Sequence, residues 1–137
     1  MIRYMLDTNI CIYLIRDKHA GIIARLKKAA KHGVAISSIT LSELEFGVHN
    51  SQHIQQNTMN LMRFLVPFDI LPFDESAARE YGKIRADLQR QGKLIGNMDM
   101  LIGAHAKSLS IKLVTNNERE FKRIEGLSLE NWARHAL

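Results

Sequence analysis

Short apolar runs alternate along the chain with longer segments in which apolar residues recur at three- and four-residue intervals. The short runs are typical of buried strands and the longer segments of amphipathic helices. The pattern predicts strands over residues 2–6, 34–37, 68–71, 112–115 and 127–129. It predicts helices over residues 9–16, 20–30, 40–49, 52–65, 75–91 and 97–109, with a short helical turn over 118–124.

The alternation of strands with helices predicts an α/β sandwich built on a central, mostly parallel sheet. No repeat, low-complexity tract or linker interrupts residues 1–137, so we expect a single domain. Ligands of such sheets bind beyond the carboxyl ends of the strands. Asp7, Ser37-Ser38 and Asn116-Asn117 all follow predicted strands, which makes this edge the expected position of a functional site.

Three carboxylates adjoin apolar segments that are far apart in the sequence. Asp7 follows the first predicted strand, Glu43 lies in a predicted helix, and Asp99 stands between two methionines. A carboxylate beside a core segment is costly unless it is paired, and no Lys or Arg is placed locally to serve all three. We therefore expect one cluster of oxygen ligands for a hard divalent cation, Mg²⁺ or Mn²⁺.

Each acid also has a simpler explanation. Asp7 can cap the helix that follows it, and Thr40-Leu41-Ser42-Glu43 has the form of a capping box. Asp99, in a first helical turn, gains at most about 1 kcal/mol from the helix dipole, which is less than the cost of burying an ionised group. Capping and metal binding are compatible for Asp7, whereas Asp99 is the acid that most needs a partner.

The polar segment that begins at Thr115 offers hydroxyl, amide and carboxylate groups through Glu120. These groups either join the acidic cluster as ligands and hydrogen-bond donors or form an ordinary polar loop before a helix. The six histidines form no zinc pattern. The chain also lacks a Walker motif and a Gly-x-Gly-x-x-Gly segment, so a nucleotide cofactor is not indicated.

Composition and charge narrow the class of protein. With 46% apolar and 24% charged residues the chain has the composition of an ordinary globular domain, and its apolar stretches are too short to span a membrane. The N-terminus lacks the features of a secretory signal and Cys11 is the lone cysteine, so we expect a cytoplasmic protein. The net charge of +5 favours a polyanionic partner such as nucleic acid, with solvated lysines as the ordinary alternative.

Five segments, in this order and spacing, resemble the VapC-type toxins, which are PIN-domain ribonucleases. They are MLDTN at 5–9, SSITLSEL at 37–44, IGNMDMLI at 95–102, LVTNNEREF at 113–121 and LENW at 129–132. The resemblance covers nearly the whole chain and implies a PIN-like three-layer α/β/α sandwich over residues 1–137. It also implies an endoribonuclease that uses Mg²⁺ or Mn²⁺ to hydrolyse RNA phosphodiesters.

The resemblance assigns roles to individual residues. It implies that Asp7, Glu43 and Asp99 are the catalytic acids and metal ligands. Many PIN domains carry a fourth acid where this chain has Asn117, so either Glu120, one helical turn later, or Asn117 acting through water would complete the ligands. The polar side chains expected around them are Thr8, Asn9, Thr115 and Asn116.

The resemblance further implies an RNA substrate, a cognate VapB-type antitoxin that covers the acidic pocket, and a homodimer. Similar toxins of enteric bacteria cut the anticodon loop of initiator tRNA, so tRNA is a candidate substrate. Candidate phosphate contacts are Lys27, Lys28, Lys31, Lys93, Arg119 and Arg123. Candidate interface residues, unless they belong to the core, are Ile12, Ile15, Leu61 and Phe64.

Two other functions stay open from the residues themselves. A Mg²⁺-binding receiver-like signalling module would need a phospho-acceptor Asp after a central strand and a Lys after a later one. Asp69 lies inside the third predicted strand and Lys112 comes before the apolar residues of the fourth, so neither fits well. A nucleic-acid-binding protein without catalysis would bind RNA and yield no metal-dependent product.

Overall fold

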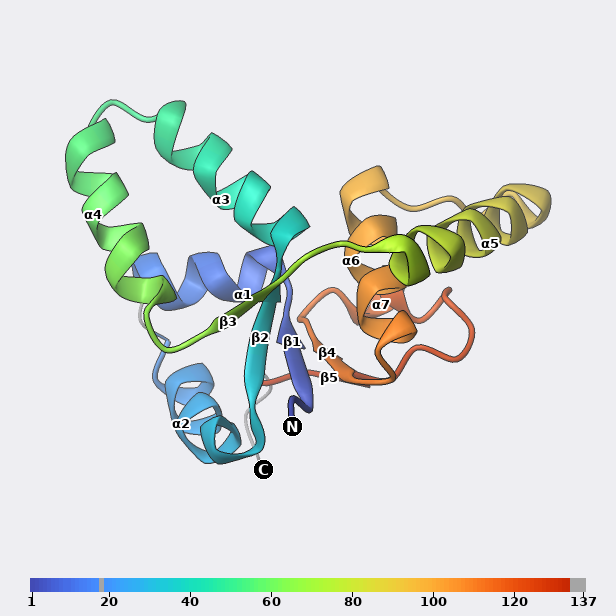
Figure 1. Cartoon of the computed structure of the whole chain (residues 1–137), viewed down its shortest axis with the longest axis horizontal. Helices are drawn as coiled ribbons and strands as arrows, with labels where there is room; N and C mark the ends of the chain where they lie inside the picture. Colours follow the sequence, from blue (N-terminus) through green and yellow to red (C-terminus); the bar gives the residue numbers. More distant parts are fainter. Residues whose placement is uncertain (18, 134–137) are drawn as a thin grey trace.

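Five parallel strands form the central sheet of the computed structural model, which describes residues 1–17 and 19–133. The sheet has the order β3-β2-β1-β4-β5 (Figure 1). The strands are β1 (Tyr4–Leu6), β2 (Val34–Ser37), β3 (Asp69–Leu71), β4 (Lys112–Val114) and β5 (Leu129–Glu130). Leu6 of the central strand pairs with Ile36 on one side and Val114 on the other, so the carboxyl ends of β1, β2 and β4 meet at one edge.

Helices follow every strand except the last. They are α1 (Thr8–Ile12), a π-helical turn (Tyr13–Asp17), α2 (Ala20–Ala29), a 3-10 turn (Ala30–His32), α3 (Ser38–His49), α4 (Ile54–Leu65), α5 (Glu75–Gln91), α6 (Asn97–Ser108) and α7 (Glu118–Phe121). No helix of the described ranges is both long enough and apolar enough to cross a membrane.

The strands supply two hydrophobic cores, one on each face of the sheet. Leu6, Ile36 and Val114 pack with residues of α1, α2, α3 and α4. Met5 and Leu113 pack with residues of α5, α6 and α7. Successive strand residues point to opposite faces, which is why neighbours such as Met5 and Leu6 enter different cores. The expected three-layer α/β/α sandwich with a parallel sheet is therefore confirmed, with the two helical layers seen on either side of the strands in Figure 1.

The element boundaries differ from the predicted ones in three instructive places. Helix α3 begins at Ser38, two residues before the predicted start, because the Ser37 hydroxyl accepts the Ile39 N–H at 3.1 Å and caps it there. The helical turn predicted over 118–124 ends at Phe121. The last strand lies at Leu129–Glu130 rather than at 127–129, because its register is fixed by pairing with β4.

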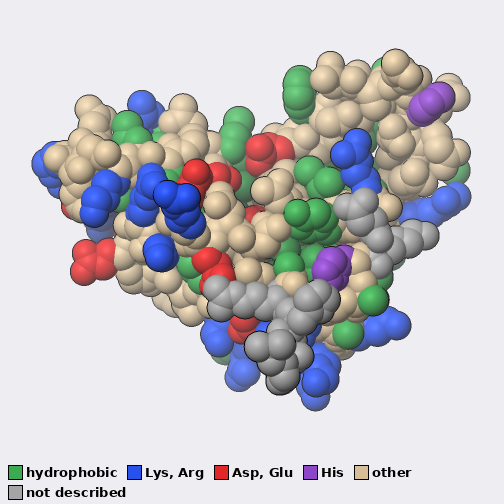
Figure 2. Space-filling view, turned by 180° about the vertical axis from the view of Figure 1, so that it is seen from behind, with side chains coloured by type: hydrophobic (Ala, Val, Ile, Leu, Met, Phe, Trp, Pro, Cys, Tyr) green, Lys and Arg blue, Asp and Glu red, His purple; other side chains and the backbone are tan. Residues whose placement is uncertain are grey.

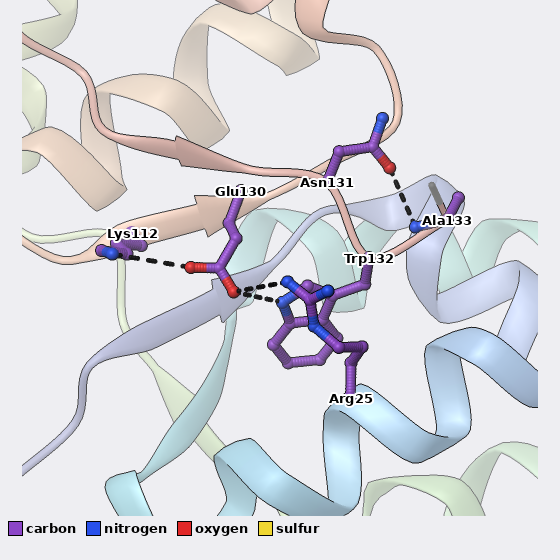
Figure 3. Close-up of polar contacts among 6 residues, drawn as sticks. All are labelled: Arg25, Lys112, Glu130, Asn131, Trp132 and Ala133. Atoms are coloured by element: carbon purple, nitrogen blue, oxygen red, sulfur yellow. Dashed lines mark hydrogen bonds and ion pairs between the residues drawn. The ribbon is translucent and has the colours of Figure 1, made fainter. Parts of the chain in front are cut away.

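A polar network around Glu130 fastens the short edge strand β5 to the rest of the sandwich (Figure 3). Glu130 Oε1 accepts hydrogen bonds from Trp132 Nε1 at 2.8 Å and Arg25 Nη2 at 3.3 Å, and Oε2 pairs with Lys112 Nζ at 3.5 Å. Burial raises the pKa of Glu130, but these hydrogen bonds and cations outweigh it and hold that pKa below its usual value. The buried Trp132 ring in turn packs edge-on against Tyr4 of β1, with centroids 5.6 Å apart.

Gly33, between α2 and β2, is held in a conformation that only glycine adopts easily. Its φ is +81°, and a Cβ there would lie 2.5 Å from Met1 O and 2.8 Å from Ile2 Cα. We expect Gly33→Ala to lower the free energy of unfolding by about 1–3 kcal/mol, since both backbone strain and a backbone clash oppose it.

Gly82, in the exposed middle of α5, provides the matched control for that measurement. A Cβ at this position meets nothing within 4 Å. Gly82→Ala should therefore raise the free energy of unfolding by about 0.5–1 kcal/mol through helix propensity. Urea denaturation of both variants checks the pair, and equal effects at the two glycines would contradict the account.

Candidate active site

Asp7 is fixed between the end of β1 and the start of α1. Its N–H donates to Val114 O at 3.0 Å, and its Oδ1 accepts the Ile10 N–H at 2.9 Å, so the side chain caps α1. The Thr115 side chain also hydrogen-bonds the carboxylate. The carboxylate is 3% exposed. Asp7 therefore caps α1, as expected from one of the two explanations of this acid, and the cap uses only its Oδ1.

Burial dominates the electrostatic state of Asp7. Burial is the largest effect and raises the pKa of Asp7 to about 6 from the usual 3.8, while the hydrogen bonds from Thr115 and Ile10 lower it in part. The negative charges of Asp99 and Glu43 raise that pKa further. All three acids are thus close enough to interact, although they come from three separate elements.

Glu43 lies in the middle of α3 and points toward α1. Thr8 Oγ1 donates to Glu43 Oε1 at 2.5 Å, and it also lies 3.4 Å from the buried hydroxyl of Thr40. The capping box considered as the alternative role of Glu43 does not form, because Ser37 caps α3 and Glu43 is too far along the helix to reach its start. The contact with Thr8 instead ties α3 to the first turn of α1.

Asp99 lies in the first turn of α6, behind Gly96, and is half-buried. Burial raises the pKa of Asp99, and the charges of Glu120 and Glu43 raise it further. The sequence-based argument that this acid lacks a local cation agrees with the direction of that shift. Asp99 therefore faces acids from both α3 and α7, which surround it with negative charge.

The three acids line one pocket of about 560 Å³ at the carboxyl edge of the sheet. The remaining lining residues are Thr8, Asn9, Ile12, Ser42, Phe46, Gly47 and Met98. In Figure 2, Asp and Glu side chains are visible at the notch between the two helical lobes, with Lys and Arg side chains on either side. The pocket thus combines a negative floor with apolar and polar walls.

The donor chemistry of this pocket fits a hard divalent cation. Clustered carboxylates whose pKa values are raised by burial and mutual repulsion gain most when a cation arrives. Over residues 1–17 and 19–133, however, no three His, Cys, Asp or Glu side chains stand close enough to enclose an ion. Glu43 Oε1 instead accepts a hydrogen bond from the Thr8 hydroxyl. The acids therefore surround a common space without forming a closed coordination shell.

The other polar residues expected at the site divide into two groups. Asn9 lines the pocket, and Thr115 supports Asp7 while its Oγ1 accepts the Asn117 N–H at 2.9 Å. Asn117 Nδ2 donates to Glu120 Oε2 at 3.3 Å. Asn116, by contrast, is directed to the Tyr13 hydroxyl at 3.2 Å and serves the packing of the π-helical turn. Asn116, Asn117 and Glu120 are absent from the pocket lining.

Two apolar residues of the pocket wall, Phe46 and Met98, were not assigned a role from the sequence. Both are exposed, Phe46 at 69% and Met98 at 46%. A signal was available in the spacing, because Phe46 follows Glu43 by three residues and Met98 directly precedes Asp99. Their exposure depends on how α3 and α6 are set against each other and could not be read from the sequence.

The sequence pattern that defines the PIN domain matches residues 4–127. The chain belongs to the PIN domain family. It is 42% identical over 133 residues to the tRNA(fMet)-specific endonuclease VapC of Shigella flexneri, covering 97% of this chain and 100% of that protein. It is 45% identical to ribonuclease VapC2 of Rickettsia felis over 94% of this chain and 97% of that one.

Solved structures agree with this placement among PIN domains. The VapBC2 complex from Rickettsia felis, bound to a DNA fragment from its promoter, superposes with a TM-score of 0.92 at 45% identity, over 96% of this chain and 99% of that chain. DNA-bound VapBC from Salmonella typhimurium also gives a TM-score of 0.92, at 40% identity and the same coverage. The resemblance to VapC-type PIN ribonucleases is confirmed.

The raised pKa of Asp7 predicts a specific pH dependence of stability in metal-free protein. Because folding favours the neutral acid, its stabilising contribution is complete below about pH 4 and is lost as the pH rises through about 6. Asp7→Asn keeps a good N-cap and removes the ionisation. We expect the variant to gain up to about 3 kcal/mol on the wild type between pH 4.5 and 7.5, measured by urea denaturation in chelator. Parallel pH profiles for the two proteins would contradict this account.

Proposed function

We propose that this chain is an endoribonuclease that depends on Mg²⁺ or Mn²⁺, hydrolyses RNA phosphodiesters and acts as the toxin of a type II toxin–antitoxin pair. The observation that carries the proposal is the gathering of Asp7, Glu43 and Asp99 from three separate elements around one pocket. Kinship with VapC ribonucleases supports the reaction class. The proposal takes residues 1–137 as a single domain and keeps the cytoplasmic location expected from the sequence.

The three acids would hold the metal ion, and the surrounding side chains would set their positions. A bound divalent ion supplies positive charge that neutralises the phosphate and makes a bound water more acidic. Thr115 and the Ile10 N–H orient Asp7, and the Thr8 hydroxyl orients Glu43 through a hydrogen bond. Asp99 is half-buried and so more accessible than Asp7, and its carboxylate is the one placed to accept the proton of the attacking water.

Glu120 is the better candidate for the fourth oxygen ligand. Its charge is the strongest carboxylate influence on Asp99, and the Asn117 amide donates to Glu120 Oε2 and so holds that side chain near the pocket. Asn117 then acts as an orienting residue for Glu120, which accounts for an amide at the position where many PIN domains carry an acid.

The substrate and partners follow from the relatives. The Shigella flexneri relative is named for tRNA(fMet), which makes tRNA the first substrate to test. We propose a VapB-type antitoxin and a homodimer for this chain, because neighbours of its fold are VapBC complexes. Ile12, Ile15 and Leu61 line a second cavity of about 270 Å³ beside the acidic pocket, and Leu61, at 3% exposure, also belongs to the core.

The receiver-like alternative requires an Asp and a Lys at one site, and its two candidates, Asp69 and Lys112, lie apart in the sheet. Asp69 lies in the edge strand β3 and is exposed, and Lys112 is paired with Glu130 in the network of Figure 3. A receiver needs these two types of residue at one site. Their separation to different strands on opposite sides of β1 leaves the nuclease as the function with a coherent site.

Asp99→Asn is the most direct test of the nuclease. The change keeps the shape of the side chain and removes the charge, so we expect a folded protein with roughly 10²–10⁴-fold slower Mg²⁺-dependent cleavage of tRNA. Glu45→Gln, on the exposed side of α3, is the matched control and should cleave as the wild type does. Cleavage is followed by gel with end mapping, with and without Mg²⁺. Full activity of Asp99→Asn would remove the proposal.

A second prediction tests whether Glu120, rather than the nearby Glu118, contributes to Mg²⁺ binding. Glu120→Gln should weaken Mg²⁺ binding by roughly 10-fold or more, the loss expected when a ligand or its close support is removed. Glu118→Gln changes an acid two residues away whose Oε2 accepts from Asn131 Nδ2 at 3.1 Å, and it should bind Mg²⁺ normally. Isothermal titration with Mg²⁺ measures both variants. Equal affinities would assign the fourth position to another group.

A further inference from the structure

Phe46 is a large aromatic residue left exposed on the wall of the acidic pocket. Its side chain is 69% exposed although α3, which carries it, is anchored in the core by the buried Leu44 and Val48. An exposed aromatic ring in a pocket that also holds charged catalytic candidates is suited to contact a ligand. The inference below rests on the proposed ribonuclease function and concerns what the substrate must look like.

The position of Phe46 relative to the acids is fixed by one helix. Phe46 follows Glu43 by three residues, so both project from the same face of α3, about 4.5 Å apart along the helix axis. Gly47, the next residue, also lines the pocket, and a Cβ at this position would meet no other part of the protein within 4 Å. A group bound against Phe46 would therefore lie directly beside a phosphate held at the acids.

Met98 lines the same pocket from a different element. It is 46% exposed and directly precedes Asp99 in the first turn of α6. The acidic floor is thus bordered by an aromatic residue adjoining Glu43 and by a thioether adjoining Asp99. A flat, partly apolar group next to a phosphate is what this combination recognises, and in RNA that group is a nucleobase.

We propose that Phe46 stacks on an unpaired nucleobase adjacent to the scissile phosphate, with Met98 contacting the same nucleotide. Base-on-aromatic stacking contributes about 1–3 kcal/mol per base. A base inside a duplex has both faces covered by its neighbours and cannot offer one to Phe46. The pocket volume of about 560 Å³ lies within the range of ordinary ligand sites. Stacking on Phe46 therefore requires a base that is unpaired beside the cut, as in a loop, and a continuous duplex would not satisfy it.

Substitutions that separate aromatic stacking from plain apolar contact test this proposal. Phe46→Ala should raise KM for a hairpin RNA by roughly 5- to 150-fold, with a much smaller effect on kcat, because stacking energy is present before and during the reaction. Phe46→Trp should restore KM, whereas Phe46→Leu should not. Val66→Ala, which truncates an 82% exposed residue just after α4, is the control for lost surface apolarity and should leave KM unchanged.

A binding measurement makes the test independent of cleavage. The experiment uses Asp99→Asn protein with Mg²⁺ and a set of hairpins, each carrying 2-aminopurine at a different loop position. The 2-aminopurine fluorescence should be quenched at one loop position when residue 46 is Phe or Trp. It should not be quenched at any position when residue 46 is Ala or Leu. Duplex RNA of the same length should not compete. Quenching that survives Phe46→Ala would overturn the stacking proposal.

Other outcomes distinguish base stacking from a protein–protein contact and from failure of the proposed nuclease function. A change of oligomeric state in Phe46→Ala, seen by sedimentation with unchanged KM, would assign the ring to a protein–protein interface and overturn the proposal. Absence of cleavage by the wild type would reject the proposed nuclease function, while position-specific quenching would still support base stacking. Cleavage by the wild type with an unaltered KM in Phe46→Ala would leave the nuclease standing and reject the stacking.

Discussion

Asp7 is a buried acid whose hydrogen bonds hold three elements together while its burial disfavours the charged form. One oxygen caps α1 and the carboxylate is held by Thr115, so the residue joins β1, α1 and β4 at the centre of the sheet. Asp99 and Glu43 add negative charge to the same space. Helices α3 and α6 thereby bring two more acids to the same pocket, where repulsion among the carboxylates lowers the stability of the fold. A bound cation would offset this repulsion, which apolar packing cannot do.

The contact between Thr8 and Glu43 joins the acidic pocket to the first turn of α1. The Thr8 hydroxyl donates to the carboxylate, whose charge still raises the pKa of Asp7 and Asp99. The hydrogen bond satisfies a half-buried charge at little cost. It also joins α3 to α1, two helices that carry pocket residues, through a side-chain contact.

Sequence patterns predicted most of the fold because strand and helix periodicities in this chain are seldom in conflict. They failed where one residue decided between neighbouring boundaries, as with Ser37, whose hydroxyl starts α3 earlier than Thr40 would. The position of Asp7 at the pocket followed from the end of its strand, but Glu43 and Asp99 reach the pocket from within α3 and α6. Asn116 and Asn117, which follow β4, do not line it. The partner of Glu43 could not be predicted, because it depends on the spacing of α1 and α3 rather than on either sequence alone. The same is true of the exposure of Phe46 and Met98.

The two outermost strands have a consequence for assembly. Strand β3 spans three residues and β5 spans two, and β5 is further pinned by the Glu130 network. Edges this short offer few free backbone groups, which disfavours extension of the sheet by a strand of another chain. The helices of the outer layers therefore present the larger surface for contact with another chain.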